Sequence, residues 1–198
     1  MKKLFLIRAA GLVILLLLSG AVLFSQEQSV TWTMALVREE DGGGVRSFSR
    51  PLSMKDGERF TLMISAEESC HCYIVLQDAA QNTVLVYSGT AGPGKDLSFG
   101  PFRIDPPSGT ETIHVVVSKT SRPTIDRAAE NYTRSKTRRN ASALMDSIYE
   151  LRRSLSSLRE QAEKPVLMGG AFRGREQPPA GVQYAGAPAY VKSIQIRH

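Results

Sequence analysis

The sequence predicts a mainly β protein: an antiparallel, immunoglobulin-like β-sandwich with one long helix packed against it. From Ser29 onward, apolar and polar residues alternate with a period of two, β-branched and aromatic residues are frequent, and turn residues recur at short intervals. After Pro123 the period becomes helical. We therefore expect a single domain over residues 26–198, with about seven to nine short strands and a helical insertion at 123–164.

Residues 1–25 are a predicted secretory signal peptide. The apolar run 12–18 follows a positively charged start made by Lys2, Lys3 and Arg8. The whole apolar stretch is shorter than the roughly 20 residues that a membrane-spanning helix needs. We expect cleavage near Ser25 and export to the periplasm, the cell surface or the extracellular space. A retained N-terminal membrane anchor is the lesser alternative.

Short strands account for the chain up to residue 118. The segment 72–76 is continuously apolar, which predicts a strand covered on both faces, and it forms a hairpin with 83–87. Residues 89–94 read as a flexible loop, and Pro101 predicts an edge strand or a bulge. The expected strands are 30–36, 45–49, 60–64, 72–76, 83–87, 97–104 and 112–118.

Two helical stretches follow, at 124–134 and from a capping Asn140 to about residue 163, where Pro165 ends the second. Apolar residues along the longer helix step by four and three: Leu144, Ile148, Leu151, Leu155, Leu158 and Ala162. This narrow stripe fits a helix laid across the sheet or, alternatively, a partner helix in a coiled-coil dimer. Residues 166–172 read as a strand, 173–189 as a loop and 190–196 as the final strand.

The chain has two cysteines, Cys70 and Cys72, which exclude a disulfide framework. On a strand both thiols point to one face, and a bridge across one intervening residue is strained. The main interpretation is that both are packed in the core. A redox pair, or a metal site with His71, remains as an alternative, although His71 points to the opposite face.

Positive charge is concentrated late in the chain. Residues 26–119 hold 8 Lys and Arg against 12 Asp and Glu, whereas residues 120–164 hold 10 against 6. The basic 134–159 region is a solvated surface or a contact for an anionic polymer or lipid surface. Its candidate anion contacts are Lys136, Arg138, Arg139, Arg152 and Arg153. Aromatic residues do not alternate with the cations in the run 135–139, which argues against nucleic acid.

Motifs of catalysis are missing from the sequence. It contains no G-x-S-x-G elbow, no complete phosphate loop and no H-E-x-x-H pattern. His71 and His114 fall in separate predicted strands, without a neighbouring ligand pair. We therefore predict no catalytic, cofactor-binding or metal-binding residue and expect no cofactor.

Several segments together resemble the bacterial domain of unknown function 4384, a β-rich module of exported proteins. The resemblance covers about residues 50–120 and rests on 56–60 entering a strand, on 72–78 and 84–87 as a hairpin, and on Phe102 with 106–111 before an apolar strand. The chain departs from the family at Ser88-Gly89, where a Pro-Asn pair is usual. The resemblance implies a binding or structural module and transfers no site residue.

These observations predict a non-catalytic, exported cell-envelope protein of a bacterium, acting as a protein-binding or structural β module. The expected partner is another envelope protein, bound through a sheet edge or the helix. The alternative is binding of an anionic envelope polymer or lipid surface through the basic region. A cryptic thiol-based enzyme is the lesser alternative, and the oligomeric state is left open.

Overall fold

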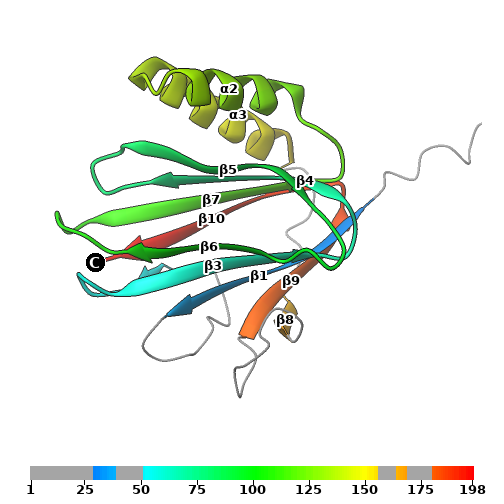
Figure 1. Cartoon of the computed structure of the whole chain (residues 1–198), viewed down its shortest axis with the longest axis horizontal. Coiled ribbons are helices and arrows are strands. Elements are labelled where there is room, and N and C mark those ends of the chain that lie inside the picture. Colours follow the sequence, from blue (N-terminus) through cyan, green and yellow to red (C-terminus); the bar gives the residue numbers. More distant parts are fainter. Residues whose placement is uncertain (1–28, 39–50, 156–163, 169–179) are drawn as a thin grey trace, which may run out of the picture.

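Two five-stranded sheets pack face to face, and two helices cover the outer face of one of them (Figure 1). This computed structural model describes residues 29–38, 51–155, 164–168 and 180–198. The predicted mainly β, sandwich-like fold is confirmed. The predicted signal peptide and the strand expected at 45–49 lie outside the described residues.

The first sheet has the strand order β6-β3-β1-β9-β8, and every neighbouring pair in it is antiparallel. Its strands are β1 (Val30–Arg38), β3 (Arg59–Ala66), β6 (Leu97–Arg103), β8 (Lys164–Leu167) and β9 (Ala180–Ala187). The pairing of β3 with β6 shifts register between the Phe60–Phe102 and Leu62–Phe99 pairs. Pro101 predicted an edge strand or a bulge, and β6 is an edge strand with this irregularity beside Pro101.

The second sheet has the order β2-β10-β7-β4-β5. Its strands are β2 (Leu52–Ser53), β4 (Cys70–Gln77), β5 (Thr83–Ala91), β7 (Thr110–Ser118) and β10 (Ala189–Arg197). The two-residue β2 runs parallel to β10, so the expectation of an entirely antiparallel sandwich is wrong at this one pair. The ten described strands also exceed the expected number.

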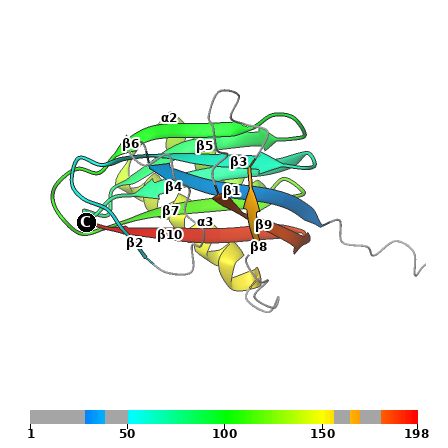
Figure 2. The same ribbon diagram turned by 90° about the horizontal axis from the view of Figure 1, so that it is seen from below.

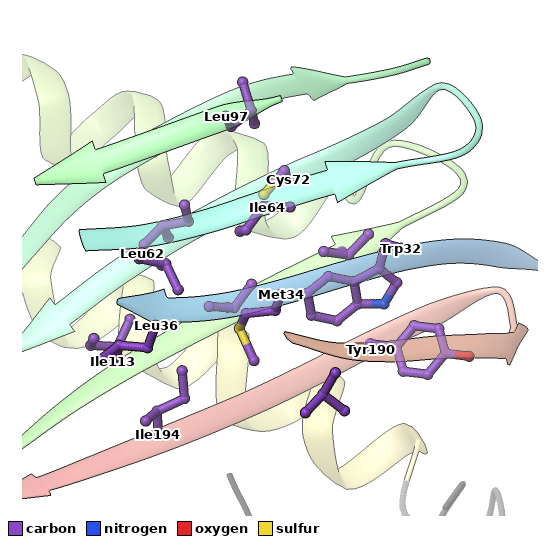
Figure 3. Packing of buried hydrophobic residues seen from close by; sticks show 14 of the residues in the cluster. Trp32, Met34, Leu36, Leu62, Ile64, Cys72, Leu97, Ile113, Tyr190 and Ile194 are labelled. Carbon is purple, nitrogen blue, oxygen red and sulfur yellow. The ribbon is translucent and has the colours of Figure 1, made fainter. Parts of the chain in front are cut away.

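The main core lies between the sheets, where alternate side chains of each strand meet (Figure 3). Trp32 stacks on Tyr184 with ring centroids 4.7 Å apart, and the edge of Tyr190 completes the aromatic group. Inward-facing side chains include Met34, Leu36, Leu62, Ile64, Cys72, Ile113 and Ile194. The period-two pattern in the sequence therefore reflects the burial of every second side chain between the sheets.

Strand β4 is buried on both faces, as its continuous apolar run predicted. Cys72 and Ile74 face the core between the sheets. Tyr73 and Val75 face the other way, into a second apolar cluster under the helices. Central strands without a polar face are expected only where both faces of the sheet are covered.

The two helices, α2 (Pro123–Arg134) and α3 (Arg138–Leu155), lie side by side on this outer face (Figure 1). Leu144 and Ile148 of α3 are fully buried against the sheet. The helix-on-sheet interpretation is therefore confirmed for these positions, while Leu158 and Ala162 lie outside the described residues. Neither helix combines the length and the apolar character needed to cross a membrane.

The expected cap of the longer helix was wrong. Helix α3 begins at Arg138, and the hydroxyl of Thr137 accepts the backbone N–H of Asn140 at 3.3 Å. The side-chain amide of Asn140 instead donates to the carbonyls of Asn131 and Ser135, 3.1 and 2.8 Å away. Asn140 therefore binds the Ser135 carbonyl just beyond α2 and adds a second donor to the Asn131 carbonyl, which already accepts the Ser135 N–H.

The positions of two expected loops and of Pro165 also differ from expectation. Strand β5 continues to Ala91, through part of the expected 89–94 loop. Strand β9 occupies the end of the expected 173–189 loop, because Gly181 allows a close approach: a Cβ there would lie 2.9 Å from the Met34 carbonyl oxygen. Pro165 lies inside β8, an edge strand that tolerates a missing N–H.

Candidate functional site

The sheet edges differ sharply in how they are protected. Among the described residues four strands have a neighbour on one side only: β2, β5, β6 and β8. Strand β2 has two residues, β8 has four and contains Lys164 and Pro165, and β6 is interrupted by a register shift beside Pro101. Short length, lysine, proline and bulges are the usual means of preventing a sheet edge from pairing with another chain.

Strand β5 has fewer of these protections. Its pairing with β4 also shifts register, between the Ile74–Tyr87 and Val75–Leu85 pairs, but it is nine residues long, contains neither proline nor a charged side chain, and pairs only with β4. Val84 is 49 % exposed, the most exposed large hydrophobic residue in the described part of the chain. We call residues 84–89 of this strand, with their outward backbone, the β5 edge.

Tyrosine hydroxyls donate to backbone carbonyls near both ends of β5. Tyr132 of α2 donates to the Thr83 carbonyl at 2.5 Å, and Tyr87 donates to the Thr90 carbonyl at 2.9 Å. The ring of Tyr87 also packs on Phe99 of β6, 5.2 Å between centroids. The Tyr132 hydrogen bond therefore ties the start of β5 to α2, which also contacts the strand, whereas the Tyr87 hydrogen bond lies within β5 itself.

A pocket of about 250 Å³ opens at the end of the sandwich where the chain end C is marked in Figure 1. It lies between the β4–β5 turn, the end of β6 and the start of β7. We call it the end pocket. Its lining residues are Leu76, Asp78, Ala79, Ala80, Phe102, Arg103, Asp105, Pro106, Pro107 and Glu111.

Glu111 is the buried acid of the end pocket. It shares the inward-facing parity of Ile113 and Val115 on β7, and it is 8 % exposed. Burial raises the pKa of the Glu111 carboxyl, an effect that nearby His198 opposes. The Nε2 atom of His198 lies 3.9 Å from Glu111 Oε1, while its Nδ1 lies 2.9 Å from Asp56 Oδ1.

The five predicted anion contacts are all exposed on the helical layer but do not form one cluster. Arg138 and Arg139 begin α3 and Lys136 precedes them, whereas Arg152 and Arg153 lie in the last turn of the helix. Thirteen residues of helix place Arg139 and Arg152 about 20 Å apart along the axis. The structure thus divides the predicted site into two separate groups of cations.

The cysteine thiols are inside the sandwich. Cys70 is 1 % exposed and Cys72 is fully buried, and both belong to the core between the sheets, which confirms the packing interpretation. Burial raises the pKa of both thiols. Thiolates are the reactive form of cysteine, so this environment disfavours thiol chemistry.

His114 lies on the opposite face of β7 from Glu111, under α3. Its Nδ1 is 2.9 Å from the Ser193 hydroxyl, and its ring meets the edge of Tyr149. Burial, assisted by the charge of Arg152, lowers the pKa of His114 to about 4. His114 is therefore neutral at pH 7 and serves as a packed side chain, as expected for a lone strand histidine.

Sequence reasoning missed both the β5 edge and the end pocket. Strand order decides which strand is an edge, and the sequence does not contain this order in any local pattern. Glu111 did leave a signal: it occupies the inward parity of an otherwise apolar strand, Ile113, Val115 and Val117. A carboxylate at such a position marks a place where the core pattern is interrupted.

Comparison with known proteins gives no further assignment: no family model matches the chain, and neither does any curated protein. Within the described ranges, no group of three or more His, Cys, Asp or Glu side chains is arranged to hold a metal ion.

Proposed function

We propose that this protein is a non-catalytic, exported cell-envelope protein that binds another envelope protein through the β5 edge. In this proposal the sandwich is immunoglobulin-like, and the resemblance to the domain of unknown function 4384 supports a binding module. Export rests on the predicted signal peptide at residues 1–25.

The observation that carries the proposal is the contrast between β5 and the other described edges. An unpaired edge offers a row of backbone donors and acceptors to any extended chain. Strand addition of this kind takes its affinity from backbone hydrogen bonds and its specificity from pockets for alternate side chains. A nine-residue strand without charge or proline provides the length and the shape that this mode requires.

The anchoring of β5 also supports binding. Tyr132 holds the start of the strand and Tyr87 packs on Phe99 of β6, so the backbone of β5 is already extended before a partner arrives. Preorganised surfaces lose less conformational entropy on association. The absence of charge on the strand favours a polypeptide over an anionic polymer as the occupant.

The test uses two lysine substitutions on exposed edge positions, Val84→Lys on β5 and Ser98→Lys on β6. Protein isolated from its native envelope should retain a defined partner through high-salt washing. We expect Val84→Lys to lower partner recovery by about tenfold, because burying a lysine in the new strand pair is costly. Ser98→Lys should recover the partner normally. Equal recovery with both variants would contradict the proposal.

A second candidate function is binding of an anionic envelope polymer or lipid surface. The observation in its favour is that Lys136, Arg138 and Arg139 are exposed around the first turn of α3, which contains no acidic residue. Replacing all three by glutamine should abolish retention on vesicles rich in anionic lipid at low salt. Retention that does not fall with salt would exclude this function, because exposed charges are strongly screened.

A further inference from the structure

The end pocket is lined by an acid, Glu111, whose side chain has no hydrogen bond to another described residue. Largely buried polar side chains normally have hydrogen-bond partners. The Glu111 side chain is 11 % exposed, and its only polar contact in the described part of the chain is His198 at 3.9 Å, too far for a hydrogen bond. The His198 Nε2 atom is likewise buried with no hydrogen-bond partner. Glu111 lines a space large enough to admit a ligand group.

The charge around this space is negative. Asp78, Asp105 and Glu111 line the pocket, and the single lining cation, Arg103, is already 2.7 Å from Asp105. The two oxygens of Asp78 accept hydrogen bonds from Asn82, which leaves its charge in place. Asp78 and Asp105 are both close enough to raise the pKa of the Glu111 carboxyl. An anionic ligand group is therefore disfavoured, and a cation is favoured.

The size and the walls of the pocket narrow the choice further. Its volume of about 250 Å³ is below the roughly 300–1,000 Å³ of sites for drug-sized ligands, so a single chain-like group fits better than a ring system with substituents. Phe102, Pro106 and Pro107 provide an apolar wall. Such a wall suits a methylene stem, and an aromatic face also attracts a cation.

We propose that the end pocket binds an aliphatic chain ending in an ammonium or guanidinium group, the chemistry of lysine and arginine side chains, with the Glu111 carboxylate as its counter-ion. The methylene stem packs on Phe102 and the prolines, and the charged head meets Glu111 at the bottom. The proposal does not depend on binding at the β5 edge, although Leu76 of the pocket lining pairs with Val84 in the sheet.

The test is a titration of the purified protein followed by the amide NMR signals of Leu76, Phe102 and Glu111. The probes are n-butylammonium, n-butylguanidinium and the neutral n-pentanol. Both cations should shift these signals saturably, and n-pentanol should bind at least about tenfold more weakly. Affinity for the cations should fall as the pH is lowered, because protonation removes the negative charge of Glu111.

Two variants provide the controls. Glu111→Gln should lose at least about tenfold in affinity for n-butylammonium, while Glu150→Gln, on the exposed face of α3, should bind it unchanged. Ser88→Lys, an exposed position of the β5 edge that pairs with Tyr73 away from the pocket, should also bind unchanged, which separates this site from the proposed protein-binding edge. The proposal is overturned if no saturable shift occurs, if n-pentanol binds equally well, or if folded Glu111→Gln keeps full affinity.

The source of the cationic group is decided by one further probe, a lysine blocked at both backbone ends. Binding of the blocked lysine at least as tight as that of n-butylammonium identifies a side chain of a polypeptide. Exclusion of the blocked lysine, with n-butylammonium still bound, identifies a small free amine. Either result keeps the counter-ion role of Glu111.

Discussion

Polar groups have different partners in two regions of this sandwich. One region is the face that the helices cover, and the other is a rim formed by the β5 edge, the β6 edge and the end pocket. Under the helices, Tyr73 donates to Asp126 at 2.5 Å and His114 reaches Ser193 at 2.9 Å. On the rim, Glu111 has no hydrogen bond within the described residues, and β5 pairs on one side only. Trp32 Nε1 and His114 Nε2 are also buried without a hydrogen-bond partner from the described chain, so a missing partner indicates a ligand site only where a cavity adjoins the group, as it does at Glu111.

The largest expected effect lies on the covered face. Ile148→Ala removes a fully buried side chain between α3 and the sheet, and we expect a loss of about 2–5 kcal/mol in the free energy of unfolding. Glu150→Ala, at the exposed second residue after Ile148, should change the free energy of unfolding by less than about 0.5 kcal/mol. Urea denaturation measures both. Similar values for the two variants would remove the distinction between packed and exposed faces of α3.

The next effect is the pH dependence caused by His114. The folded-state pKa of about 4 lies below the ordinary 6.5, so the unfolded chain binds more protons between these values. Stability should therefore be complete above pH 6.5 and fall as the pH drops towards 4, by on the order of 3 kcal/mol. His114→Gln, which keeps an amide for Ser193, should flatten this slope. An unchanged slope in that variant would assign the acid sensitivity elsewhere.

Glu111 should behave in the opposite sense. Its raised pKa means that the folded protein holds this proton longer than the unfolded chain, so stability attributable to it falls as the pH rises above 4.5. Glu111→Gln is expected to be at least as stable as the natural protein at pH 7, with a gain below about 1 kcal/mol. Thermal unfolding at pH 4 and pH 7 checks this. A large loss of stability at pH 7 would make Glu111 a structural residue.

The smallest expected effect concerns the edges themselves. Val84→Lys on β5 and Ser98→Lys on β6 replace exposed side chains, so each should change the free energy of unfolding by less than about 0.5 kcal/mol. Chemical denaturation of the two variants provides the measurement. A marked loss in Val84→Lys alone would mean that Val84 packs within the molecule and that β5 is less open than described.

Much of this arrangement follows from local sequence. Alternation in β1 and β7 predicted their strands, the continuous run in β4 predicted cover on both faces, and Pro101 predicted the irregular edge. The limits are also physical. Strand β9 begins with small residues because Gly181 packs against β1, so its composition resembles that of a loop. Asn140 favours a cap, but the competing carbonyls of α2 attract its side chain.

The candidate sites were less predictable, because they depend on tertiary neighbours. The cations of the 134–159 region are close in sequence, yet the length of α3 separates them into two groups. The end pocket joins residues from β4, β6 and β7 that no spacing rule connects. The β5 edge exists only because β4 lies on one side of β5 and no described strand lies on the other.

The most direct measurement places a photo-crosslinking amino acid at position 84 on β5 and, as the matched control, at position 98 on β6, in protein expressed in its own envelope. Irradiation should join position 84 to one discrete envelope protein and leave position 98 without that adduct. The same adducts at both positions, or none at position 84, would contradict a role of β5 in recognising a partner.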